Sequence, residues 1–103
     1  MPEKRKHARI PFVADTEILL ENESPYSGEI QNISLAGAFV KTDKVLKYEE
    51  KLTLRFSLPG VTSICEIPCI VRWTKKDEGA GLQFETLRAI EVWALNKIAR
   101  NAP

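Results

Sequence analysis

Apolar and polar residues alternate along most of the first 85 residues of the chain. Residues 52–58 (LTLRFSL) place every apolar side chain on one face and every polar one on the other, which is the pattern of a half-buried strand. Five further segments that favour strands are separated by turn-forming residues: 14–22, 26–34, 37–42, 63–73 and 79–85. Six short strands with this spacing predict a small antiparallel β-barrel.

The pattern changes after Thr86. Six apolar residues recur at helical spacing and define one stripe: Leu87, Ile90, Trp93, Ala94, Leu95 and Ile98. Such a stripe indicates an amphipathic helix, and Thr86 is a residue type that favours the N-cap position. We therefore predict an all-β fold with a small helical part, a six-stranded antiparallel β-barrel with a C-terminal α-helix over residues 87–100.

Charge distinguishes the N-terminus from the rest of the chain. The 103 residues suffice for one domain, and 15 Lys and Arg against 14 Asp and Glu leave a net charge of +1. The first nine residues hold four Lys and Arg and one Glu, so they carry +3 and the remainder carries −2. We expect a flexible basic arm over residues 1–12 and a barrel with its helix over residues 13–103, with any anion site near the arm.

Cysteine usage and targeting signals bear on the compartment. Cys65 and Cys69 lie four apart in a predicted strand, so their Cα atoms would be roughly 13 Å apart, too far for a disulfide. No signal-peptide pattern is present and no apolar run approaches the length of a membrane span. We expect free thiols, a cytoplasmic location and no membrane insertion.

The sequence argues against catalysis and against a metal site. The one histidine, His7, lies in the basic arm without a nucleophile or paired carboxylates nearby. Two cysteines and one distant histidine make no metal-ligand set, and no glycine-rich phosphate loop leads from a strand into a helix. We therefore expect a binding protein that is not an enzyme.

Two short motifs are the candidates for binding. Arg5 and Arg9 are four residues apart, and the sequence Asn32-x-Ser34-x-x-Gly37 follows at the end of a predicted strand. Asn32 and Ser34 would point to one face of that strand, and Gly37 would allow a left-handed or tight conformation where the chain turns. Each motif alone is unspecific, because paired arginines are common and Asn, Ser and Gly are ordinary turn residues.

Together the two motifs resemble the PilZ domain family, whose signature is RxxxR followed by D/NxSxxG on a six-stranded barrel with a C-terminal helix. Residues 70–87 also resemble the late hairpin of that family, so the likeness extends from Arg5 to about Arg100. The resemblance implies that cyclic di-GMP binds at Arg5, Arg9, Asn32, Ser34 and Gly37, with no other cofactor. Arginine suits this ligand because its planar fork pairs with phosphate or guanine and stacks on bases.

Lys4 precedes the first motif arginine and bears on stoichiometry. In the family, an arginine at that position tends to accompany two stacked ligands, and an apolar residue a single ligand. Lysine supplies a cation that would reduce repulsion among four phosphate charges, although it lacks the planar fork. We therefore expect Lys4 to contact the ligand and to support two ligands per chain at low ionic strength.

The resemblance implies a receptor or adaptor that orders its arginine arm over the barrel on binding cyclic di-GMP and relays the signal to a protein effector, as a monomer or weak dimer. One alternative is a PilZ-like adaptor that no longer binds the nucleotide. Another is a small nucleic-acid-binding barrel. We do not expect a nucleic-acid partner, because the strands show no exposed aromatic ladder and the body of the chain is acidic.

Overall fold

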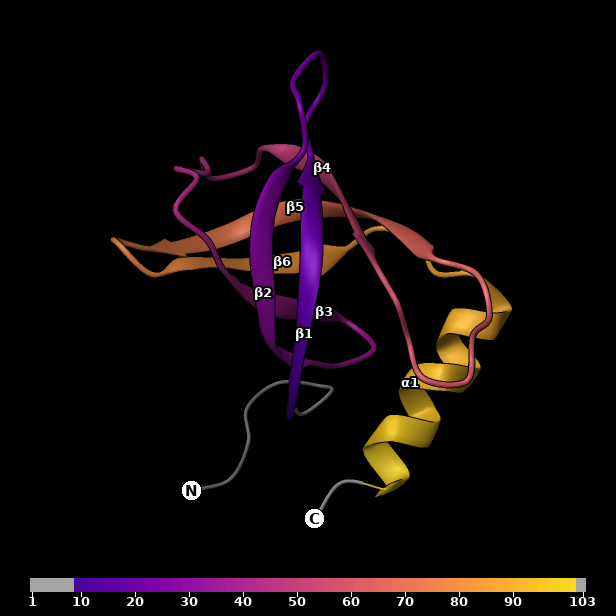
Figure 1. Cartoon of the computed structure of the whole chain (residues 1–103). Coiled ribbons are helices and arrows are strands. Elements are labelled where there is room, and N and C mark those ends of the chain that lie inside the picture. The colour runs from indigo at the N-terminus through magenta and orange to yellow at the C-terminus, as the bar shows by residue number, and fades with distance from the viewer. Residues whose placement is uncertain (1–8, 102–103) are drawn as a thin grey trace, which may run out of the picture.

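The computed structural model describes residues 9–101, which form a closed antiparallel barrel followed by one helix (Figure 1). Around the barrel the strand order is β1-β2-β3-β6-β5-β4. The elements are β1 (Ile10–Leu19), β2 (Tyr26–Ile33), β3 (Gly37–Lys41), β4 (Lys51–Phe56), β5 (Cys65–Lys75), β6 (Gly79–Phe84) and α1 (Ala89–Asn101). The predicted fold class, its six strands and its C-terminal helix are confirmed.

The barrel interior follows the period-two pattern. Leu52, Leu54 and Phe56 of β4 point inward, and alternate residues of β5 do the same. Ala94 and Leu95 of α1 join the same apolar cluster, so the helix covers the barrel as expected. Burying each large apolar side chain contributes about 1.5–3 kcal/mol, and this cluster is the main source of stability.

Most boundaries differ by a few residues from those that the sequence predicts, and two of the differences matter for the site and for the helix. β1 begins at Ile10, so residues 10–12, which the sequence assigned to the arm, belong to the barrel. The helix begins at Ala89, and Thr86 is not its N-cap. The start is set instead by Glu91, whose Oε1 accepts the backbone N–H of Arg88 at 2.8 Å, half of a capping box.

Glu91 also changes the buried face of α1. Its side chain is 1% exposed, whereas Ile90, predicted to face the core, is 42% exposed. The Glu91 carboxylate receives two hydrogen bonds from the guanidinium of Arg88, from Nε at 3.0 Å and Nη2 at 2.9 Å. A buried carboxylate persists here because it is both paired and hydrogen-bonded.

Both cysteines lie inside the barrel as free thiols, as predicted. Burial raises the pKa of the Cys69 thiol to about 12. Because the thiolate is the reactive species, Cys69 is a packing residue and not a nucleophile.

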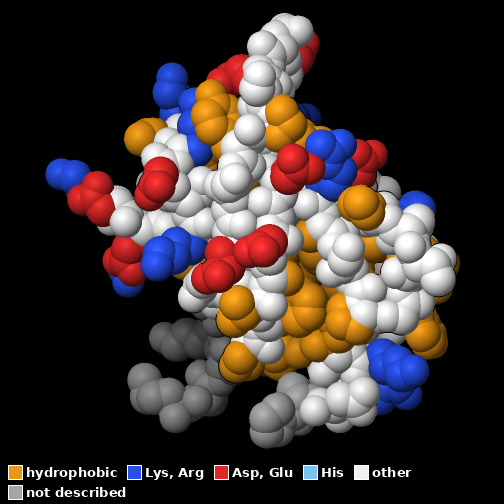
Figure 2. Space-filling model, viewed as in Figure 1, with side chains coloured by type: hydrophobic (Ala, Val, Ile, Leu, Met, Phe, Trp, Pro, Cys, Tyr) orange, Lys and Arg blue, Asp and Glu red, His pale blue; other side chains and the backbone are white. Residues whose placement is uncertain are grey.

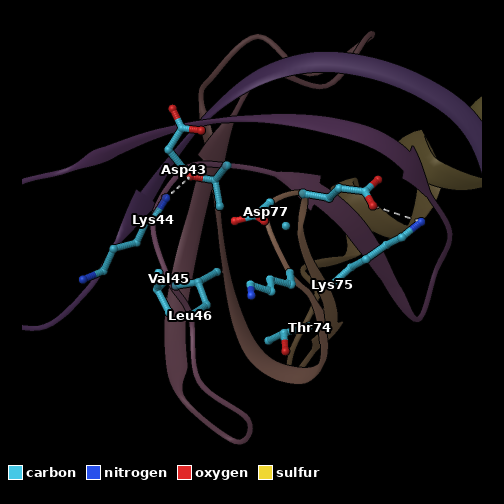
Figure 3. Close-up of a pocket in the computed structure, with 11 residues that line it drawn as sticks. Asp43, Lys44, Val45, Leu46, Thr74, Lys75 and Asp77 are labelled. Carbon is cyan, nitrogen blue, oxygen red and sulfur yellow. Dashed lines mark hydrogen bonds and ion pairs between the residues drawn. The ribbon is translucent and has the colours of Figure 1, made fainter.

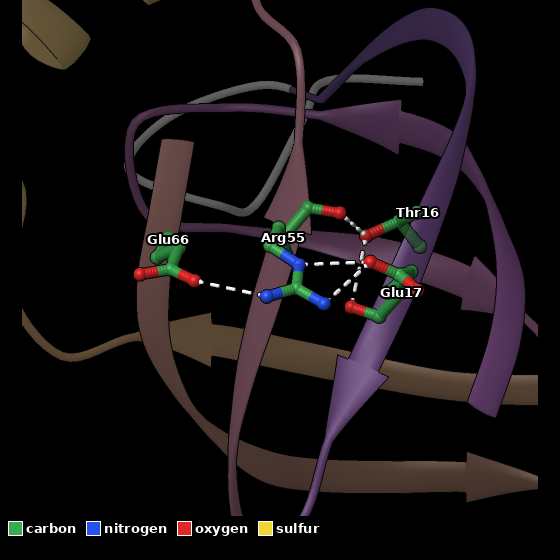
Figure 4. Close-up of polar contacts among 4 residues, drawn as sticks. All are labelled: Thr16, Glu17, Arg55 and Glu66. Carbon is green, nitrogen blue, oxygen red and sulfur yellow. Dashed lines mark hydrogen bonds and ion pairs between the residues drawn. The ribbon is translucent and has the colours of Figure 1, made fainter. Parts of the chain in front are cut away.

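A row of charged side chains joins three strands on the outer surface (Figure 4). Arg55 of β4 lies between Glu17 of β1 and Glu66 of β5, with Nη2 2.7 Å from Glu17 and Nη1 3.4 Å from Glu66. Behind this row, the hydroxyl of Thr16 donates to the carbonyl oxygen of Arg55 at 3.0 Å. Each half-exposed ion pair is worth less than about 1 kcal/mol, so the row mainly specifies how β1 aligns with β4.

Gly37 is needed for a reason other than the predicted one. Its φ is not positive, so of the two expected conformations, left-handed or tight, the left-handed one is excluded. Gly37 begins β3 opposite Gln83 of β6, and a Cβ there would lie 1.9 Å from the carbonyl oxygen of Leu82. The residue must be glycine because two backbones pass too close for a side chain.

We predict that Gly37→Ala destabilises the protein by several kcal/mol, since β3 would have to separate from β6 to relieve a clash with backbone. Gly81→Ala is the matched control. A Cβ at Gly81 would meet the indole of Trp73, 2.1 Å from Nε1, and a side chain can swing away. Urea unfolding followed by circular dichroism compares the two, and equal stability of Gly37→Ala and wild type would contradict this role of Gly37.

A second prediction concerns Arg88 and Glu91. Arg88→Ala leaves the buried Glu91 carboxylate without its cation and should cost roughly 3 kcal/mol. Glu91→Gln keeps an acceptor for the Arg88 N–H and leaves an arginine that is half exposed to water, so it should cost only about 1 kcal/mol. Chemical denaturation measures both, and the reverse order of stability would refute this account.

Candidate functional site

A break in the strand pairing turns Asn32 toward the outer surface. Ile30 and Ile33 of β2 are both fully buried although they are three residues apart, which regular alternation forbids. The register between β2 and β3 shifts between Ile30 and Asn32, and this bulge reconciles the two. Asn32 therefore lies outside the core, between Pro11 of β1 and Phe39 of β3.

A second bulge, in β5, turns Trp73 toward the outer surface. The register between β5 and β6 shifts between Val71 and Trp73. Val71 is fully buried, so strict alternation would turn Trp73 inward, yet 41% of Trp73 is exposed. Bulges re-aim side chains and are frequent beside binding sites.

Phe39 and Trp73 stack on each other across β6. Their ring centroids are 5.2 Å apart and the rings are inclined by 16°. Gly81 lies opposite both residues, on the strand between them. Because Gly81 has no side chain, the indole can cross β6 and reach Phe39.

Arg9 extends over the Trp73 ring of this pair. Its guanidinium carbon lies 6.0 Å from the centroid of the Trp73 ring, at the outer limit of a cation–π contact. The second arginine of the predicted motif therefore lies on the same outer face as Phe39 and Trp73.

The side-chain oxygen of Asn32 is the least satisfied polar atom of this region. Oδ1 is buried and accepts no hydrogen bond from the part of the chain that the structure describes. An unsatisfied buried acceptor costs about 1–3 kcal/mol. It thus indicates a position at which a donor from outside the chain would be stabilised.

Ser34 has a different environment from the predicted one. It lies beyond the end of β2 and is 8% exposed, so it does not share a strand face with Asn32. Its Oγ accepts the backbone N–H groups of Ala36 at 3.0 Å and Gly37 at 3.3 Å. Ser34 therefore holds the turn that leads into β3, and its hydroxyl proton remains available to a further acceptor.

The structure thus gathers Arg9, Asn32, Phe39 and Trp73 on one face, with the Ser34–Gly37 turn at the end of β2. Lys4 and Arg5 lie outside the described residues. The stacked Phe39–Trp73 pair is a feature that the sequence analysis did not predict. No pattern in the sequence signals the bulge in β5, because Val71 and Trp73 have the same parity, as a regular strand with one buried face would have.

A separate hollow lies between residues 42–46 and the β5–β6 hairpin (Figure 3), with a volume of about 500 Å³. Its charges are mixed, and two of its lysines are paired, Lys44 with Glu23 at 3.6 Å and Lys75 with Glu78 at 3.2 Å. This lining does not favour an anion. Among residues 9–101, no group of three His, Cys, Asp or Glu side chains could hold a metal ion, and no helix is long and apolar enough to cross a membrane.

No curated protein matches the chain in sequence. The PilZ domain of YcgR from Escherichia coli, solved with c-di-GMP, has a TM-score of 0.74 at 12% identity, over 97% of this chain and 92% of that one. The Bacillus subtilis inhibitor of motility MotI/DgrA has a TM-score of 0.72 at 22% identity, and the match covers 96% of this chain and 51% of that one. The MrkH–c-di-GMP complex of K. pneumonia has a TM-score of 0.70 at 16% identity, and the match covers 98% of this chain and 52% of that one.

These likenesses show the fold, and the chain spans about half the length of MotI/DgrA and of MrkH. The family is shown by the sequence itself. The family model for the PilZ domain matches residues 3–100, which include Arg5, Arg9 and the segment from Asn32 to Gly37. This chain belongs to the PilZ domain family.

Proposed function

We propose that this protein is a bacterial receptor for cyclic di-GMP that acts by binding and not by catalysis. The observation that carries the proposal is the buried, unsatisfied Oδ1 of Asn32. It lies on the barrel face where Arg9 extends over Trp73, which stacks on Phe39. The family membership and the two solved neighbours that contain c-di-GMP support it.

The ligand has two phosphates and two guanines, and the site offers a matching group to each. Asn32 Oδ1 can accept an N–H of a guanine, which removes the penalty of the unsatisfied oxygen. Arg9 and Arg5 can pair with phosphate oxygens or with guanine O6 and N7, and their guanidinium planes can stack on a base. Ser34 and Gly37 would shape the backbone on which the ligand rests.

In this proposal the ligand holds residues 4–9 over the barrel and the change is read by a partner protein. Lys4 would lie where a second ligand stacks on the first, and its role stays a prediction. The receptor would act in the cytoplasm, where free thiols such as Cys65 and Cys69 persist.

One observation favours a second candidate, a barrel that binds single-stranded nucleic acid. Phe39 and Trp73 beside Arg9 resemble a stacking platform. The two rings cover each other, however, since they are stacked at 5.2 Å, and the pair offers fewer free faces than two separate aromatics. Titration with single-stranded DNA and with a linear guanine dinucleotide separates this candidate from the cyclic ligand.

We predict that Arg9→Ala and Arg5→Ala each weaken cyclic di-GMP binding at least tenfold in calorimetric titration. A charge-assisted hydrogen bond is worth about 1.5–3 kcal/mol, which corresponds to that loss or more. Arg100→Ala, an exposed arginine of α1, is the matched control and should bind like wild type. Undiminished affinity in the Arg5→Ala/Arg9→Ala double variant would rule out the site.

We further predict that Asn32→Ala separates binding from stability. Affinity for cyclic di-GMP should fall at least tenfold, because the acceptor for the guanine is lost. The melting temperature should not fall, because the variant removes an unsatisfied buried oxygen. A melting curve and a titration on the same sample test both, and a clear loss of stability would show that Asn32 is a structural residue.

A further inference from the structure

An apolar groove lies between the start of β1, the β4–β5 loop and α1. Its lining includes Ile10, Phe12, Pro59, Ala94, Lys97 and Ile98, and its volume is about 410 Å³. Figure 2 shows hydrophobic side chains gathered on this side of the molecule, with Lys or Arg at the edge of the patch. Arg9, Asn32, Phe39 and Trp73, which carry the proposed nucleotide site, do not line the groove.

Trp93 extends the apolar surface beyond the groove. It is 43% exposed, and a Cβ on Gly60, which lines the groove, would lie 3.0 Å from its ring. The ammonium of Lys97 lies 5.0 Å from the centroid of the Trp93 ring. An aromatic residue with an apolar groove beside it is typical of the centre of a protein interface.

The charges on this surface have one sign. Lys97 and Arg100 are exposed on α1. The only acidic residue of α1 is Glu91, which is 1% exposed and bound to Arg88. The exposed surface of the helix is therefore cationic, without a carboxylate of its own to neutralise it.

We propose that this groove docks a short amphipathic segment of a partner protein, with apolar side chains for the groove and carboxylates for Lys97 and Arg100. The claim that this groove is the output surface of the receptor rests on the proposed function. The docking of the partner segment itself requires no nucleotide. The apolar anchors would supply most of the affinity, and the two cations would set orientation and association rate.

Two other occupants fit the surface less well. A second copy related by a two-fold axis would bring Lys97 and Arg100 close to their own counterparts, and like charges in an interface are unfavourable. A bilayer could meet the cations but could not fill a concave groove, which needs protruding side chains. A partner segment with acidic and apolar residues satisfies both the shape and the charge.

The test is selection of random 12-residue peptides, displayed on phage, against the full chain, with counter-selection against the Trp93→Ala/Lys97→Glu/Arg100→Glu variant. We expect enrichment of peptides that combine large apolar residues with Asp and Glu. Lys97→Glu/Arg100→Glu should weaken binding of a synthetic selected peptide at least tenfold in fluorescence anisotropy. The matched control Lys47→Glu/Lys76→Glu, at exposed sites away from the groove, should bind as wild type does.

Several results would overturn the proposal: no enrichment of acidic apolar peptides, or peptide binding that is indifferent to Lys97→Glu/Arg100→Glu. Dimerisation through this surface in light scattering, or binding to phosphatidylglycerol vesicles in place of peptides, would assign the groove to those partners instead. Cyclic di-GMP affinity is measured on the same variants and should not change. A protein that binds peptide but no nucleotide would refute the proposed receptor function alone.

Discussion

The pairing of β3 with β6 is the contact on which the rest of the structure depends. β1, β2 and β3 follow one another around the barrel, as do β4, β5 and β6 in reverse, and these halves meet at two seams, β3–β6 and β1–β4. The β3–β6 seam closes tightly because Gly37 lets the two backbones approach. It also brings Phe39 and Asn32 from the first half beside Gly81 and Trp73 from the second. The pairing of β3 with β6 therefore also assembles the candidate site.

The buried polar side chains of the barrel and helix divide into those that form hydrogen bonds within the protein and those that do not. Glu91 is buried, but its hydrogen bonds with Arg88 cap the helix. Thr16 and Ser34 likewise form hydrogen bonds with the backbone: the Thr16 hydroxyl donates to the carbonyl oxygen of Arg55, and Ser34 Oγ accepts the N–H of Ala36. Asn32 Oδ1 is the exception among the described residues, and an exception of this kind is expected where a protein reserves an atom for a ligand.

The proposed nucleotide site and the apolar groove share the start of β1. Pro11 pairs with Asn32 in the barrel and also lines the groove. Residues 10–12 thus connect the arginine motif with α1 through a few residues of one strand. If both proposals hold, the ligand site and the partner surface lie on adjoining parts of the same small domain, since residues of one strand contribute to both.

The sequence by itself determined the six strands, the helix and the RxxxR and NxSxxG motifs. Periods of two and of 3.6 residues report which face of an element is buried, and motif spacing survives any detail of packing. Only the three-dimensional packing shows that Trp73 faces outward and that Glu91, not Ile90, lies on the buried face of α1. It also shows that residue 37 must be glycine, because the backbone of Leu82 passes too close for a side chain. Each of these depends on the distance between groups from different strands, or between a helix and the barrel. Such distances are set by bulges and by closure of the barrel, which no local pattern encodes.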